Sequence, residues 1–167
     1  MKKIEAISFK HFLEKFPKIE LPVTLTEESS LSFSRTNDPL PALMIEQFLQ
    51  PIDEGEIDDY TEYIACFKIP KTNLFHAIVY WKAGLLNYEY ILATFTKKGE
   101  LIDKKVIAGT KSDGKSLTQS AATIDEDWII YIVGGVALLQ STKNYEPTSS
   151  QSISFEMLPS GQIIAAE

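Results

Sequence analysis

Apolar and aromatic residues gather in four short runs between residue 63 and residue 107, and short turns rich in polar residues separate the runs. Short runs of this composition that are bounded by turn-forming residues are typical of β-strands. Turns such as Lys97-Lys98-Gly99-Glu100 are too short to hold a crossover helix, so consecutive strands must run antiparallel. The segment therefore predicts a meander of four strands, over Tyr63–Ile69, Leu74–Trp81, Asn87–Thr96 and Leu101–Ile107.

Both faces of the central predicted strands carry large apolar side chains. In the second strand, Phe75 and Val79 point to one face, and Ile78 and Tyr80 to the other. A sheet that is apolar on both faces has to be covered on both. We expect helices on one face, while the other closes as a barrel or meets a second sheet. Further strands are predicted over Leu117–Ile124, Trp128–Val133, Ser152–Met157 and Gln162–Ala165.

Two helices are predicted before the meander. The first carries apolar residues at helical spacing, begins after Ser8 as N-cap and stops at Pro17; its stripe is Phe9, Phe12, Leu13 and Phe16. The second begins with Asp38 as N-cap and Pro39 at the first helical position, and it stops at Pro51. An extended segment, Leu21–Thr26, lies between them.

These elements predict one α+β domain over residues 1–167 that is mostly β. Residues 1–52 form a helical N-terminal part, and residues 60–167 form the antiparallel meander. Turn spacing indicates roughly seven to ten strands, closing into a barrel or sandwich with the two helices packed on it. Ser141–Ser152 is predicted to be a polar loop.

Composition indicates a globular protein of a reducing compartment. Apolar residues make up 44 % and charged residues 23 % of the chain, and Cys66 is the single cysteine. Glu5 and Lys10 interrupt the apolar run that a signal peptide would need, and no run is long enough to span a membrane. The sequence predicts a cytoplasmic protein without a membrane contact.

The net charge of −7 is unevenly distributed along the chain. Arg35 is the only arginine, which disfavours nucleic-acid binding because arginine is the usual ligand of phosphates and base edges. Acidic residues are concentrated in the segment 53–59. This acidic segment is either a solvated face or a surface that attracts a basic protein partner. Its candidate partner-binding residues are Asp53, Glu54, Glu56, Asp58 and Asp59.

One segment matches the phosphate-binding loop pattern GxxxxGK[ST]. Its pattern residues are Gly109, Gly114, Lys115 and Ser116; Lys115 would reach the outer phosphates and Ser116 would ligate magnesium. However, the preceding strand is polar and arrives through a tight hairpin, whereas a true phosphate-binding loop follows a buried parallel strand. Nucleotide binding through this segment is therefore the alternative hypothesis.

Four aromatic residues flank the turn at Lys82-Ala83-Gly84. They are Tyr80, Trp81, Tyr88 and Tyr90. Aromatic residues at strand ends can line the mouth of a barrel and hold a small ligand, and they can equally fill the core or form cross-strand pairs. A ligand-binding barrel is thus a second alternative.

Other chemistry has few residues to draw on. His11 and His76 are the only histidines, so no metal site is predicted, and no cofactor fingerprint is present. Cys66 and His76 fall on neighbouring predicted strands, but a buried cysteine is favoured over a nucleophile pair.

Two segments carry a resemblance to known sequences, Tyr88 to Asp103 and the motif Phe16-Pro17-x-x-x-Leu21-Pro22. Together they cover less than a quarter of the chain. They resemble segments of an uncharacterised β-meander-rich family of bacterial proteins. The resemblance implies a meander and no activity. Taken together, the sequence predicts a non-catalytic binding or protein-interaction domain, such as an acidic immunity-type or escort protein for a basic partner.

Overall fold

The computed structural model describes residues 7–53, 59–85, 87–112, 114–138 and 147–166. Nine strands form a single antiparallel sheet, within the range that turn spacing predicted. The strands are β1 Val23–Leu25, β2 Glu62–Lys68, β3 Phe75–Ala83, β4 Asn87–Thr96, β5 Leu101–Ser112, β6 Ser116–Ile124, β7 Ile129–Leu138, β8 Pro147–Met157 and β9 Ile163–Ala165.

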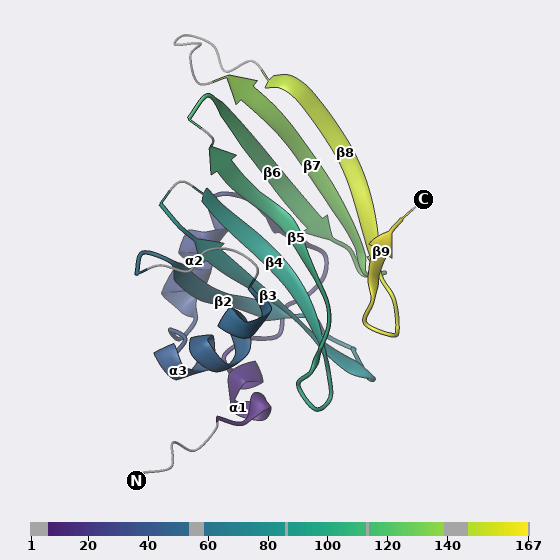
Figure 1. The fold of residues 1–167 in the computed structure, drawn as a ribbon. Coiled ribbons are helices and arrows are strands. Elements are labelled where there is room, and N and C mark those ends of the chain that lie inside the picture. The colour runs from purple at the N-terminus through teal and green to yellow at the C-terminus, as the bar shows by residue number, and fades with distance from the viewer. Residues whose placement is uncertain (1–6, 54–58, 86, 113, 139–146, 167) are drawn as a thin grey trace.

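Strands β2 to β9 lie side by side in chain order, so the predicted meander is confirmed (Figure 1). Strand β1 is the exception, because it pairs with β6 across almost a hundred residues of chain. Along one edge, β6 pairs with β7 over its whole length. Along the other edge, Leu117–Ser120 pair with β5, and Ala122–Ile124 pair with β1.

The sheet separates two apolar cores, and the predicted alternation of faces is confirmed. On β3 and β4, Ile78, Tyr80, Ile91 and Ala93 pack with the helices; we call this the helix-side core. The alternate residues of the same strands pack with β1, β6, β7 and β8; we call this the inner core. Its members from β3 and β4 are Phe75, Ala77, Val79, Tyr90 and Leu92.

The sheet does not close into a barrel, so that part of the fold prediction is wrong. It bends until the turn after β8 returns to β4 and β5, where the Thr94 hydroxyl donates to the Gly161 carbonyl at 2.6 Å. The backbone amide of Ile163 donates to the Asp103 carboxylate at 2.8 Å. Closure would need β2 to pair with β9, but Asn37 contacts the backbone of β2 instead. The inner core is therefore enclosed by bending and side-chain contacts.

The first predicted helix is confirmed as α1, Phe9–Glu14, and the Ser8 hydroxyl accepts from the His11 amide at its N-terminus. The predicted start of the second helix is wrong. α3, Ala42–Met44, begins after Pro41, and it continues as π-helix η1, Ile45–Leu49, and 3-10 helix η2, Gln50–Ile52. Pro41 explains the difference, because a residue that precedes proline is excluded from the helical region.

A further helix, α2, Ser29–Thr36, was not predicted from the sequence. Its four serines are poor helix formers, and no side chain caps its N-terminus. Tertiary contacts stabilise it instead: the Phe33 ring lies 5.8 Å from that of Phe67. Just after the helix, the Asn37 amide donates to the carbonyls of Ala65 and Cys66 at 2.7 and 2.9 Å. These carbonyls lie at a bulge in β2.

The C-terminal part of the predicted loop Ser141–Ser152 is strand, because β8 begins at Pro147. Residues 141–146 lie outside the described residues. Within the described part of the chain, no helix combines the length and the apolar character that crossing a membrane requires.

We expect Asn37→Ala to lower the free energy of unfolding by about 1–3 kcal/mol, because it leaves two partly buried carbonyls of the β2 bulge without their donor. Urea unfolding measures this change. Asn73→Ala, at an exposed turn position, is the control and should be nearly neutral. Equal small effects of the two substitutions would show that Asn37 does not hold α2 to the sheet.

Candidate functional site

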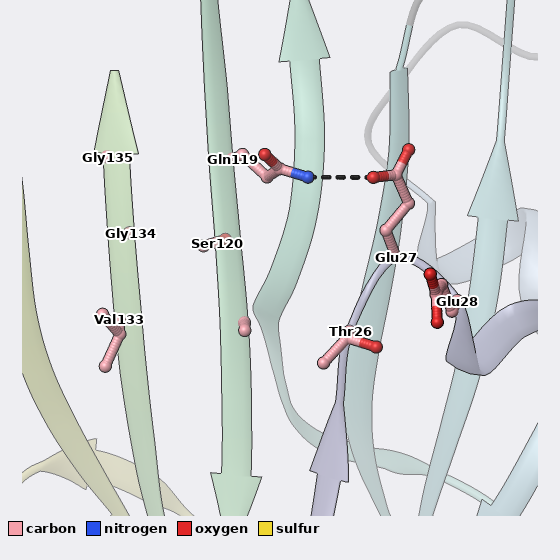
Figure 2. Close-up of a pocket in the computed structure, with 9 residues that line it drawn as sticks. Thr26, Glu27, Glu28, Gln119, Ser120, Val133, Gly134 and Gly135 are labelled. Atoms are coloured by element: carbon pink, nitrogen blue, oxygen red, sulfur yellow. Dashed lines mark hydrogen bonds between the residues drawn. The ribbon is translucent and has the colours of Figure 1, made fainter. Parts of the chain in front are cut away.

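An open groove lies between the segment that follows β1 and the middle of β6 and β7 (Figure 2). It has a volume of about 540 Å³, and we call it the Glu27 groove. Three segments supply its walls: the link between β1 and α2, the middle of β6 and the middle of β7. The lining residues are Thr26, Glu27, Glu28, Gln119, Ser120, Ala121, Val133, Gly134 and Gly135.

The floor of the groove is one face of β6 and β7, where Ala121 and Val133 supply apolar side chains. Ala121 is paired with Val133 across β6 and β7, and Gln119 is paired with Gly135, so these four residues share one face of the sheet. Val133 is 55 % exposed although it is a β-branched apolar residue. Glycine at two successive positions of β7 leaves the backbone uncovered. This floor can take an apolar group or a flat stretch of backbone.

The rim of the groove carries negative charge. Glu27 and Glu28 are both exposed, and none of the nine lining residues is basic. In Figure 2 the side chains of Glu27 and Gln119 point toward each other, and the amide of Gln119 donates to the Glu27 carboxylate at 3.0 Å. This bond holds one of the two carboxylates in place beside β6.

Three of the four predicted ligand-binding aromatic residues lie behind this rim. The Tyr90 hydroxyl donates to the Thr26 carbonyl at 2.8 Å. The Tyr88 hydroxyl accepts from Thr110 at 2.6 Å, and the Tyr88 ring lies 5.9 Å from that of Trp81. Burial raises the pKa of the Tyr88 hydroxyl, and hydrogen bonds with Thr110 and Gln119 partly offset this. These residues position the groove.

Tyr80, the fourth of that set, lies apart from the other three. It is buried in the helix-side core, whereas Tyr90 belongs to the inner core on the opposite face of the sheet. The structure therefore does not bring the four aromatic residues together around one cavity, and the sheet forms no barrel mouth for them to line.

The segment that matches the phosphate-binding pattern forms a hairpin. Gly109 belongs to β5, Gly114 lies in the turn with φ of +88°, and Ser116 is the first residue of β6. A side chain at Gly109 would lie 2.3 Å from the Tyr88 carbonyl oxygen, so close approach to β4 requires glycine there. Since a strand follows the segment, it does not supply the helix N-terminus that holds phosphates in such loops.

The acidic segment is divided by the fold. Asp53 is buried, forms an ion pair with Lys82 at 2.7 Å and accepts a hydrogen bond from the Tyr63 hydroxyl. Asp59 is exposed. Glu54, Glu56 and Asp58 lie outside the described residues. Asp53 therefore anchors η2 to β2 and β3.

Cys66 and His76 do not form a nucleophile pair. Cys66 lies in the inner core, and burial raises the pKa of its thiol, which keeps it protonated. The His76 ring lies 5.9 Å from Phe9, which packs against the helix-side core. In the described part of the chain, no group of three or more histidine, cysteine or acidic residues is placed to hold a metal ion.

Sequence reasoning did not identify the Glu27 groove. Glu27 and Glu28 follow an apolar strand, and Gln119 lies in a weakly patterned one, so neither segment carries a motif. The available signal was the pair Gly134-Gly135 inside a strongly apolar strand, which marks uncovered backbone. No protein-family model, curated protein or solved structure matches the chain.

We expect the protein to lose stability as pH rises above about 10, where unfolded tyrosine ionises. Burial and the charge of Asp53 raise the pKa of Tyr63 and Tyr80 well above the ordinary value. Both hydroxyls therefore stay protonated in the folded state while the unfolded state loses protons. Each tyrosine contributes a slope of up to about 1.4 kcal/mol per pH unit.

Urea unfolding between about pH 9 and 11 tests this expectation. Tyr63→Phe should give a smaller loss of unfolding free energy over that interval than the wild type. Tyr60→Phe, at a residue that is 67 % exposed, is the matched control. An identical slope in wild type and Tyr63→Phe would show that Tyr63 ionises normally in the folded protein.

We expect Mg·ATP to leave the melting temperature unchanged in the wild type and in Lys115→Ala, because the segment around Lys115 is a hairpin. Differential scanning calorimetry is the measurement. A ligand at a hundred times its dissociation constant adds about 2.7 kcal/mol, which such a scan detects. A shift that disappears in Lys115→Ala would contradict this expectation.

Proposed function

We propose that this protein is a non-catalytic binding domain that receives a basic segment of a partner protein in the Glu27 groove. The observation that carries the proposal is the combination of an acidic rim with an apolar floor in one open groove. An immunity-type or escort role toward a basic partner is the concrete form of this proposal.

Lysine and arginine side chains match both parts of the groove. Their aliphatic stems cover apolar surface while their charged ends remain near water or a carboxylate. A stem lying on Ala121 and Val133 would bring its charged end to Glu27 or Glu28.

The charge of the whole chain supports the same class of partner. A net charge of −7 attracts a basic protein at long range and increases the rate of encounter. The exposed Asp59 would contribute to this attraction without lining the groove. The groove and the acidic segment can therefore be tested separately.

The test is a titration with a short fluorescent peptide that alternates lysine and alanine, followed by fluorescence anisotropy. We expect saturable binding that weakens as salt is added, since exposed charges are screened. Glu27→Gln and Glu28→Gln should each weaken binding about two- to fivefold, and the double variant about tenfold. The substitutions keep the size of each side chain.

Two controls separate the groove from general acidity. A peptide that alternates glutamate and alanine should not bind. Asp59→Asn removes one negative charge outside the groove and should change affinity by less than either rim variant. If Asp59→Asn and the double rim variant weaken binding equally, the groove is not the site. If no variant has an effect, attraction comes from net charge alone.

A further inference from the structure

A second hollow, of about 690 Å³, lies at the other end of β1 from the Glu27 groove. Three segments surround it: the chain before β1, the turn after β2 and the turn between β6 and β7. Its volume is within the range of small-molecule sites, about 300–1,000 Å³. The lining residues are Lys18, Ile19, Glu20, Leu21, Pro70, Lys71, Glu126 and Trp128.

Trp128 has an unusual backbone conformation in this hollow. Its φ is +65°, the left-handed region that glycine and asparagine occupy most easily. The position ends a tight turn in which the Asp125 carboxylate accepts from the amides of Asp127 and Ile129. A bulky aromatic residue in this conformation is a genuine outlier, and such outliers concentrate at functional sites.

Lys71 shares this property. Its φ is +66°, it follows Pro70 in the turn after β2, and its side chain is exposed. Among the described residues, Lys71 and Trp128 are the two non-glycine residues with positive φ, and both line this hollow. Glycine would adopt this backbone conformation without strain at both positions. The sequence nevertheless has a lysine and a tryptophan there.

The remaining walls combine apolar and charged side chains. Ile19 and Leu21 are partly buried against the inner core, and the Trp128 ring contacts the Phe75 ring edge-on at 5.7 Å. Lys18, Lys71, Glu20 and Glu126 lie on the rim. The ion pair found among the described residues joins Lys82 and Asp53. None of the four charged residues on this rim takes part in an ion pair with another described residue.

We propose that this hollow binds a small organic monoanion with a flat apolar body, such as an aromatic carboxylate or sulfonate. The body would lie against the Trp128 indole with Ile19 and Leu21 beneath it, and the anionic group would pair with Lys71 and Lys18. Glu20 and Glu126 on the same rim disfavour a polyanion such as a nucleotide. The site does not depend on the proposed partner groove, because the two share no lining residue.

The experiment uses three matched probes: naphthalene-2-carboxylate, the neutral naphthalene-2-methanol and the cationic naphthalene-2-methylammonium. The Trp81→Phe variant leaves Trp128 as the single tryptophan, so its emission reports the hollow directly. We expect saturable quenching by the carboxylate, binding of the alcohol weaker by at least about tenfold, and no binding of the ammonium compound.

Two substitutions then test the assigned residues by calorimetric titration. Lys71→Gly keeps the left-handed turn and removes the ammonium group, so carboxylate affinity should fall about tenfold while the melting temperature is unchanged or higher. Trp128→Asn, which tolerates the same conformation, should abolish binding of both the carboxylate and the alcohol. Lys98→Gly, at an exposed turn position that does not line the hollow, is the control and should leave affinity unchanged.

Two results would overturn the proposal. Equal binding of all three probes would show general association with exposed apolar surface. If carboxylate binding survives both Lys71→Gly and Trp128→Asn, the hollow is not a ligand site. The same conclusion follows if the wild type shows no saturable binding. Lys71→Gly keeps the proposal testable if Trp128→Asn fails to fold.

Discussion

The pairing of β1 with β6 is the interaction on which the rest of the structure depends. β7 occupies one edge of β6 completely, so β5 and β1 must share the other edge, four residues for β5 and three for β1. Leu25 of β1 is fully buried in the inner core, next to Ala122 of β6. Since β5 separates from β6 at this point, the sheet can bend around its inner core without closing as a barrel.

The same short strand positions both proposed sites. Residues 18–21, before β1, form a wall of the Trp128 hollow, and residues 26–28, after β1, form the rim of the Glu27 groove. Three paired residues fix both segments against the sheet. A small change in the register of β1 would therefore move a wall of each site together, although the two sites share no side chain.

Polar groups inside the fold mainly serve to position these segments. The hydroxyl of Tyr90 holds the Thr26 carbonyl, the amide of Asn37 covers the bulge of β2, and Asp53 joins η2 to Lys82 and Tyr63. Apart from the bond between Asp53 and Tyr63, these contacts join residues far apart in the sequence. They provide hydrogen-bond partners for backbone and side-chain groups that burial would otherwise leave without one. An irregular N-terminal part can pack on a regular sheet only when such groups have partners.

The meander, its strand faces and α1 could be predicted from the sequence, because they follow from apolar runs, short turns and an N-cap, all of which act between near neighbours. The sequence also indicated that Leu21–Thr26 is extended, but the pairing of β1 with β6 depends on tertiary structure, since three residues cannot form a strand alone. The helix α2 depends on it too, because a serine-rich helix needs packing against Phe67. Tertiary structure also decided both sites. Glu27 meets Gln119, and Lys71 and Trp128 line one hollow, only because distant segments converge at the two ends of β1, and no local pattern encodes that convergence.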